Sequence, residues 1–260
     1  MMNMNDSDSI IDQLINEVRD DKTHGASQLA REALDIMRTA AISTQAEDAG
    51  QLRAELEEIG GRLMKVRPAM APVYNTVNLL LEAISRHPAA DISSLQQAVD
   101  NEVDRLVEDS VTALRKIAAY AANLVEDDET VMTHSYSSTV AAALKAARKK
   151  HRIEVIVTRS GPGRTGERTV WELSYSGIPV TFIDDTAMGL YVNEVDKVIV
   201  GADRICADGG LVNGAGTFLL ALATQKAGKP FYVLCETMKL DKRLQSSEVE
   251  LEEKEPAEVA

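Results

Sequence analysis

Five short segments of β-branched and apolar residues, between about residues 130 and 240, constrain the fold more than any other feature. Each is separated from the next by enough chain for a helix or a crossover connection. Strands that alternate with helices predict a parallel sheet with helices on its faces. We expect strands over residues 130–133, 153–158, 179–183, 197–200 and 230–235, and helices over residues 138–150, 167–175, 186–192 and 217–227.

The chain before these segments shows apolar residues every three or four positions, as in a helix. The first such group is Ile10, Ile11, Leu14, Ile15 and Val18. Further helices are expected over residues 26–42, 47–59, 72–85 and 92–124, with breaks at Gly60-Gly61, Arg67-Pro68 and His87-Pro88. We therefore predict an α/β protein with a helical N-terminal domain over residues 1–126 and a Rossmann-like, parallel-sheet C-terminal domain over residues 127–260.

The charge balance argues against nucleic acid as a direct partner, because 41 acidic against 28 basic residues give a net charge of −13. The acidic run over residues 248–258 is expected to be a solvated face. Two cysteines, Cys206 and Cys235, supply neither a disulfide framework nor the ligand spacing of a metal site. The N-terminus lacks the pattern of a signal peptide, and no apolar stretch is long enough to cross a membrane. These features predict a cytoplasmic protein.

The loop over residues 201–217 is the most informative stretch, because its glycines let the backbone approach a ligand closely. Thr217 then opens an apolar helix, whose N-terminus could hold a phosphate. The spacing matches neither the dinucleotide-binding nor the P-loop fingerprint, and a tight strand-to-helix turn explains the same glycines. Asp203, just past a strand, could bond a hydroxyl or act as acid or base, or it could be a turn aspartate.

Other candidates are weaker. His134 and Ser135 follow the first strand, but adjacent strand-end residues point to opposite faces and so form no nucleophile and base pair. Cys206 could place a thiol beside the cleft or be a small buried hydrophobe, and Cys235 is expected to be buried. Trp171 is expected to pack in the core.

Two features of the N-terminal half could reach a phosphate across the domain interface. Residues 23–27 open a helix, and Arg67 closes a basic patch with Arg62 and Lys65. An ordinary helix start and a solvated basic face are the alternatives for these two features.

The chain resembles the superfamily of translation initiation factor 2B regulatory subunits and sugar-phosphate isomerases, which includes ribose-1,5-bisphosphate isomerase and methylthioribose-1-phosphate isomerase. The resemblance extends from about residue 22 to residue 259. It is carried by residues 133–137, 184–188, 197–203, 229–233 and 236–240, with Asn213, Gly216 and Thr217.

The resemblance implies a helical domain docked on a Rossmann-like domain, a homodimer or higher oligomer, a sugar-phosphate pocket between the domains, and no cofactor. In the isomerases a cysteine at the position of Ser135 and the aspartate at Asp203 shuttle the proton. The ligand-binding positions carried over are His24, Gly25, Ala26, Arg67, Ser135, Asp203, Asn213 and Gly214. Relatives continue past the position of Val259 with a further strand and helix, so we expect this end of the family fold to be absent here.

The chain departs from the isomerase pattern at several of these positions. Ser135 replaces the cysteine, and a hydroxyl is a much poorer acid or base at neutral pH than a thiol of pKa near 8.5. Gly214 and Gly161 stand where the isomerases carry a lysine and an arginine, and His24 replaces another arginine. Arg159 stands where relatives carry a glutamate, which reverses the local charge.

The first hypothesis is therefore a non-enzymatic regulatory subunit, which binds a phosphorylated sugar or nucleotide and an initiation-factor partner. The second is a ribose-1,5-bisphosphate isomerase that tolerates Ser135 and uses Cys206 or another group instead. A third is a paralogue that only completes an oligomer.

Overall fold

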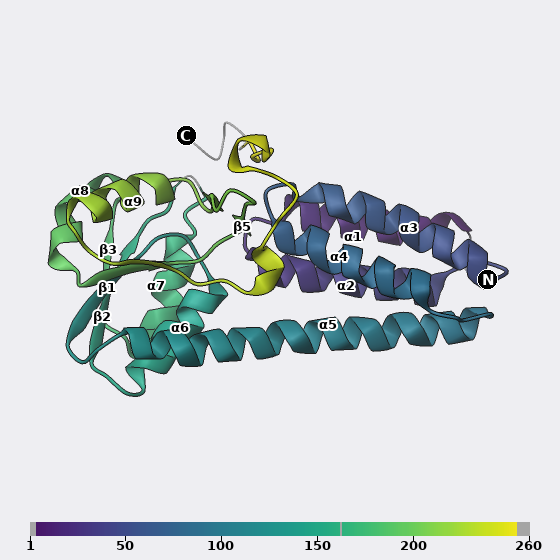
Figure 1. Cartoon of the computed structure of the whole chain (residues 1–260), viewed down its shortest axis with the longest axis horizontal. Helices are drawn as coiled ribbons and strands as arrows, with labels where there is room; N and C mark the ends of the chain where they lie inside the picture. The colour runs from purple at the N-terminus through teal and green to yellow at the C-terminus, as the bar shows by residue number, and fades with distance from the viewer. Residues whose placement is uncertain (1–3, 162, 254–260) are drawn as a thin grey trace.

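The computed structural model describes residues 4–161 and 163–253, and it has a helical part and a sheet part joined by one long helix (Figure 1). The helices of the first part are α1 (Met4–Asp20), α2 (Ala26–Ser43), α3 (Ala49–Val66), α4 (Ala71–Arg86) and α5 (Ile92–Ala121). α5 runs beneath the others and reaches the sheet part, where the 3₁₀ turn η1 (Ala122–Leu124) ends it. No helix among the described residues is both long and apolar enough to span a bilayer.

Apolar rows and capping aspartates account for the helical part. The Asp48 side chain accepts a hydrogen bond from Gln51 N at 2.9 Å, and Asp91 accepts one from Ser94 N at 2.8 Å. Each cap satisfies an amide that the first helical turn leaves without a partner. The inward faces meet in one apolar core, whose fully buried members include Leu29, Leu34, Met37, Leu52, Leu80 and Leu95.

The sheet of five parallel strands has the order β3-β2-β1-β4-β7. Its strands are β1 (Glu129–Thr133), β2 (Ile153–Thr158), β3 (Val180–Ile183), β4 (Lys197–Val200) and β7 (Phe231–Val233). The chain builds outward from β1 to β3, returns to the other side of β1 as β4, and ends at β7. The connections after β1 and β4 therefore run to opposite faces of the sheet. A crevice at such a switch point is where open α/β sheets bind ligands.

Helices cover both faces of this sheet (Figure 1). Val131 and Val155 face α6 (Ser138–Arg148) and α7 (Gly166–Tyr175), together with the end of α5. Their neighbours Met132 and Ile156 face the opposite core, which holds Met188 of α8 (Met188–Tyr191) and Leu220 of α9 (Thr217–Lys226). This alternation along each strand is the two-residue period of a sheet buried on both faces.

The predicted fold class and the five strands are confirmed, whereas several details differ. The break at Gly60-Gly61 is wrong, because α3 continues to Val66. Trp171 does not pack in the core: it is 68% exposed and stacks on Tyr175 of the same helix, with ring centroids 5.6 Å apart. The helix expected over residues 186–192 divides into η2 (Asp185–Ala187), α8 and η3 (Val192–Glu194). The boundary at residue 126 stays a prediction.

A short antiparallel hairpin was not predicted from the sequence. It consists of β5 (Arg204–Ile205) and β6 (Leu211–Val212) and lies within the loop after β4. After β7 the chain continues through η4 (Thr237–Lys239) and η5 (Ser246–Glu248), and the hairpin and this last segment lie between the two parts of the molecule.

Substitutions at the paired glycines of α3 should separate helix propensity from helix packing. A Cβ at Gly61 meets nothing within 4 Å, whereas a Cβ at Gly60 lies 2.8 Å from Leu81 Cδ1. We expect Gly61→Ala to raise the free energy of unfolding by about 0.5–1 kcal/mol, the usual gain of alanine over glycine in a helix. Gly60→Ala should not show this gain, because its Cβ would be too close to Leu81 of α4. Urea unfolding of both variants tests this, and equal stabilisation would contradict it.

Candidate functional site

The loops after β1 and β4 touch at the carboxyl ends of these strands. A Cβ on Gly201 would lie 2.6 Å from Ser137 Oγ, so only glycine fits at this contact. Ser137 itself caps α6, because its hydroxyl accepts a hydrogen bond from Val140 N at 3.3 Å. The two loops therefore form one continuous surface at the switch point of the sheet.

His134 is a fully buried structural residue beneath this surface. Its Nε2 lies 2.6 Å from the carbonyl oxygen of Ala215, which can only accept, so Nε2 carries the proton and Nδ1 accepts from Thr158 Oγ1 at 2.6 Å. Burial lowers the pKa of His134, which keeps the ring neutral. The imidazole thereby joins β1, β2 and the loop before α9, and both nitrogens are occupied.

Ser135 has a left-handed backbone, with φ of 64°. Its amide donates to Ser160 Oγ at 2.7 Å, and its hydroxyl lies 3.3 Å from Thr165 Oγ1. Thr165 is the one hydrogen-bond partner of this hydroxyl among residues 4–161 and 163–253. Gly214 lies directly above it, since a Cβ at Gly214 would meet Ser135 Oγ at 2.8 Å. The serine hydroxyl thus faces another hydroxyl and a glycine rather than a base.

A second strained serine lies beside Ser135, in the loop after β2. Ser160 has φ of 60°, and Asp185 fixes its loop by accepting from the amides of Ser160 and Gly161, both at 2.8 Å. Left-handed non-glycine residues cost about 1–3 kcal/mol each and gather at functional sites. Sequence reasoning did not single out Ser160 or Thr165, because the left-handed backbone and the contacts between the loops leave no mark in the sequence.

Asp203 is half-buried at the junction of the two parts of the molecule. Its amide donates to Val212 O at 2.9 Å, and its carbonyl accepts from Ala71 N at the start of α4 at 3.1 Å. Burial raises the pKa of the Asp203 carboxyl and Glu252 adds to this rise, while Lys239 and Arg67 oppose it. The carboxyl is therefore poised to hold a proton more readily than an exposed aspartate.

Arg67 is only 5% exposed and does not belong to a basic patch as expected. Its Nε donates to Glu252 Oε1 at 2.8 Å, and its Nη1 donates to the carbonyls of Asp21 at 2.9 Å and Val18 at 3.4 Å. Arg62 instead forms an ion pair with Asp12 on α1. The expectation that the acidic tail is a solvated face is wrong for Glu252, because this carboxylate is the partner of Arg67; residues 254–258 lie outside the described residues.

His24, Gly25 and Ala26 form the start of α2, where the helical part meets the sheet part. The amide of His24 donates to Asp21 Oδ1 at 2.6 Å, and its Nδ1 lies 2.9 Å from Asp21 Oδ2. Gly25 is the extended N-cap residue. The carbonyl of Thr23 accepts from the Arg168 guanidinium of α7. The helix start is thus bonded to the sheet part on one side and, through Asp21, to Arg67 on the other.

Asn213 closes the loop before α9. Its Nδ2 donates to Thr217 Oγ1 at 3.0 Å, and this hydroxyl donates to Gly214 O at 2.7 Å. α9 begins at Thr217 as predicted, after Gly216 with φ of +100°. Asn213 therefore maintains the shape of the loop that lies over Ser135.

The predicted site residues fall into two groups. His24, Gly25, Ala26, Arg67 and Asp203 lie on the side of the helical part, whereas Ser135, Asn213 and Gly214 lie over the ends of the strands. The hydrogen bond from Asp203 to Val212 connects the two groups.

Cys206 does not offer a thiol to this site. It is buried, and burial raises its pKa, which suppresses the reactive thiolate form. Burial likewise raises the pKa of the half-buried Cys235.

A separate cavity of 410 Å³ lies among α1, α2 and α3. Its titratable lining consists of Asp12, Glu55 and Glu58 with a single cation, Arg62. Three carboxylates against one guanidinium suit a phosphate poorly.

The comparisons with known proteins place this geometry in a family. The Initiation factor 2 subunit family, IF-2B, matches residues 22–260. The chain belongs to this family. A putative translation initiation factor eIF-2B subunit 2-like protein of Pyrococcus horikoshii is 35% identical over 244 residues, which cover 94% of this chain and 84% of the relative. Ribose 1,5-bisphosphate isomerase of Archaeoglobus fulgidus is 35% identical over 246 residues, or 94% of this chain and 76% of the relative.

Solved structures agree with this assignment. The Pyrococcus horikoshii translation initiation factor eIF-2B superimposes with a TM-score of 0.83 at 33% identity, covering 94% of this chain and 84% of that one. The 5-methylthioribose 1-phosphate isomerase of the same organism shares the fold, with a TM-score of 0.77 at 21% identity over 96% of this chain and 73% of that one. The resemblance noted from the sequence is confirmed.

Buried His134 should make the family fold sensitive to mild acid. Its pKa is lowered in the fold, so below the usual value of about 6.5 the unfolded chain takes up a proton that the folded chain does not. We expect the free energy of unfolding to fall between pH 6.5 and 5.5, by at most about 1.4 kcal/mol. His134→Gln should flatten this slope, whereas His87→Gln in an exposed loop should not. Urea unfolding at both pH values tests this, and an unchanged slope in His134→Gln would contradict it.

Proposed function

We propose that this protein is a regulatory-subunit-like member of the family, which binds a phosphorylated sugar or nucleotide between its two parts. The observation that carries the proposal is the junction of the two parts of the molecule, where the buried guanidinium of Arg67 is close enough to the carboxyl of Asp203 to lower its pKa. A guanidinium suits a phosphate and a carboxyl suits a sugar hydroxyl. A phosphorylated sugar needs both kinds of group.

The surroundings of Ser135 support binding without catalysis. A general acid or base needs a pKa near the working pH, and the Ser135 hydroxyl has Thr165 rather than a titratable group beside it. The neutral His134 is held by Thr158 and Ala215, so it is not free to activate the serine. Buried Cys206 does not replace the missing thiol.

Isomerisation of ribose 1,5-bisphosphate is the second candidate. The relative with that name is as similar to this chain as the eIF-2B subunit 2-like relative, at 35% identity each. The raised pKa of Asp203 also suits a proton-transfer group. Activity measurements decide between the two candidates.

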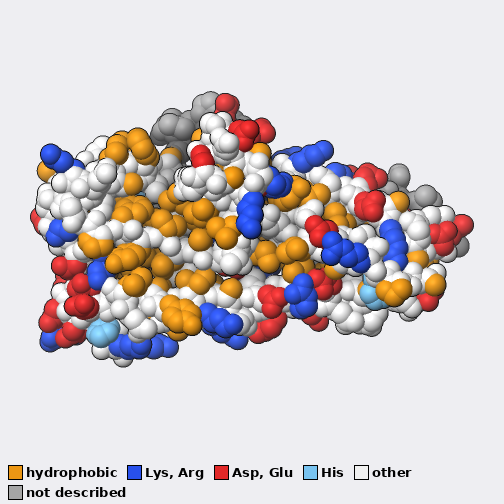
Figure 2. Space-filling model, in the orientation of Figure 1, with side chains coloured by type: hydrophobic (Ala, Val, Ile, Leu, Met, Phe, Trp, Pro, Cys, Tyr) orange, Lys and Arg blue, Asp and Glu red, His pale blue; other side chains and the backbone are white. Residues whose placement is uncertain are grey.

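We also propose a cytoplasmic homodimer or higher oligomer with an initiation-factor partner. A related structure is the tetrameric eIF2B-beta2-delta2 complex from C. thermophilum. α9 exposes Phe218, Leu219 and Leu222, which are 73%, 66% and 46% accessible. Figure 2 shows hydrophobic side chains gathered on the sheet part. Exposed apolar surface of this kind favours burial against another subunit.

Ligand binding should appear as thermal stabilisation. Ribose 1,5-bisphosphate or a nucleoside monophosphate should raise the melting temperature, because a ligand at a hundred times its Kd stabilises the fold by about 2.7 kcal/mol. Asp203→Asn should reduce the shift more than it lowers the melting temperature of the free protein. Glu154→Gln, which removes one charge from an exposed position on β2, should leave the shift unchanged. No shift with any of these ligands at millimolar concentration counts against the proposal.

Isomerase activity should be weak or absent in the natural chain. A positioned acid or base typically contributes about 10²- to 10⁴-fold, so Ser135 in place of a thiol should cost about that factor. Ser135→Cys should restore part of any activity. Detection of ketose product from ribose 1,5-bisphosphate tests this. A natural-chain turnover of about 1 to 10³ per second would establish the isomerase instead.

A further inference from the structure

The segment over residues 241–252, here called the strap, brings the chain back from the sheet part to the helical part. It runs along the β5–β6 hairpin, where Ala207 N donates to Leu244 O at 2.9 Å and Ser246 Oγ donates to Asp208 Oδ2 at 2.6 Å. Its first residue, Asp241, donates its amide to Ile205 O at 2.8 Å. The first half of the strap, residues 241–246, is thus bonded to the hairpin.

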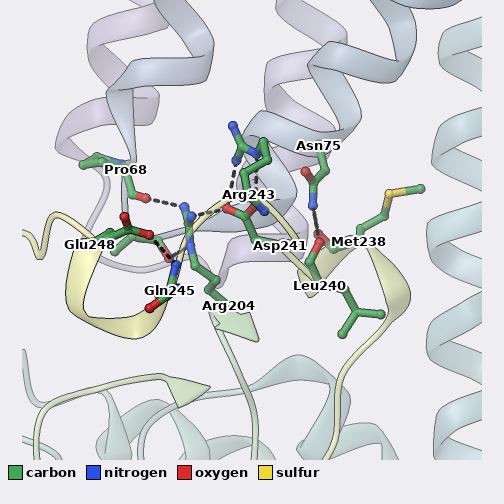
Figure 3. A network of polar contacts seen from close by, with 10 residues as sticks. Pro68, Asn75, Arg204, Met238, Leu240, Asp241, Arg243, Gln245 and Glu248 are labelled. Carbon is green, nitrogen blue, oxygen red and sulfur yellow. Dashed lines mark hydrogen bonds and ion pairs between the residues drawn. The ribbon is translucent and has the colours of Figure 1, made fainter. Parts of the chain in front are cut away.

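Charged residues fix the start of the strap on α4, as Figure 3 shows. Arg204 of the hairpin donates hydrogen bonds to the carboxylate of Asp241 and to the carbonyl of Pro68. The side chains of Arg204 and Asp241 are 3% and 0% exposed. Arg243 donates to Asp241 at 2.9 Å, and its guanidinium lies 3.3 Å from the ring centroid of Tyr74. These contacts hold the start of the strap against the helical part.

The strap ends at Arg67, where the carboxylate of Glu252 accepts a hydrogen bond from Nε of the guanidinium. The carbonyl oxygens of Asp21 and Val18 accept hydrogen bonds from Nη1. Nη2 donates no hydrogen bond to any residue that the structure describes. One edge of a planar five-donor group is therefore fixed by three acceptors, and the remaining donors are left to one side.

We propose that Glu252 is a positioning residue, which holds Arg67 so that Nη2 faces the anionic group of the ligand. This inference rests on the proposed function. Arginine carries about 2 kcal/mol of rotamer entropy, and a carboxylate that fixes Nε removes this freedom before the ligand arrives. A negative charge beside an anion site opposes binding, so the proposal requires that orientation outweighs repulsion. If Glu252 instead occupies the place of the ligand, its removal must strengthen binding, so the sign of the effect decides.

Calorimetric titration of the full chain with ribose 1,5-bisphosphate and with inorganic phosphate tests the proposal. Glu252→Ala should weaken binding about tenfold, the scale for removing an outer partner that orients a binding group. Glu252→Gln keeps an acceptor for Nε and should restore most of the affinity. Glu253→Ala, at the exposed neighbouring position, should leave binding unchanged. Unchanged or tighter binding by Glu252→Ala would overturn the proposal.

The Nε–H resonance of Arg67 gives a readout that needs no ligand. In ¹⁵N-arginine-labelled protein, Glu252→Ala should shift this resonance and Glu253→Ala should not, with assignment from Arg67→Lys. If the natural chain binds neither ribose 1,5-bisphosphate nor inorganic phosphate, the proposed function is wrong. The resonance then still tests whether Glu252 orients Arg67. A resonance that Glu252→Ala does not move would overturn the proposal.

Discussion

The buried ion pair between Arg204 and Asp241 is the interaction on which the rest of the site depends. Both side chains are almost fully withdrawn from water, and Arg204 also bonds the carbonyl of Pro68. Removing one partner of such a pair leaves an unpaired buried charge and costs about 3–5 kcal/mol. The pair therefore fixes the hairpin, the strap and the start of α4 relative to one another.

This fixed junction explains why the site belongs to neither part of the chain alone. Asp203 comes from the loop after β4, Arg67 from the end of α3, and Glu252 from the strap. Ser135 and Gly214 approach from the ends of the strands. Groups on separate elements can bind one small ligand only if those elements keep their relative positions, so the rigidity of the junction and the affinity of the site are linked.

The sequence predicted the elements with strong local periodicity. The five strands were found because their β-branched runs are short and well separated, and the start of α9 was found because glycines precede Thr217. The predicted glycine break in α3 was wrong because packing of Gly60 against Leu81 overrides the low helix propensity of glycine. The predicted burial of Trp171 was wrong because this exposed residue follows the same helical spacing as a core residue. The hairpin, the partner of Arg67 and the strained serines depend on contacts far apart in sequence, which no local pattern encodes.

The central claim, that one ligand contacts both parts of the molecule, is tested most directly by hydrogen–deuterium exchange with and without ribose 1,5-bisphosphate. The ligand should slow amide exchange in both parts of the molecule: in residues 21–26 and 67–71 of the helical part and in residues 201–217 of the sheet part. Slower exchange confined to the sheet loops, or to the helical part, would contradict a site built between them.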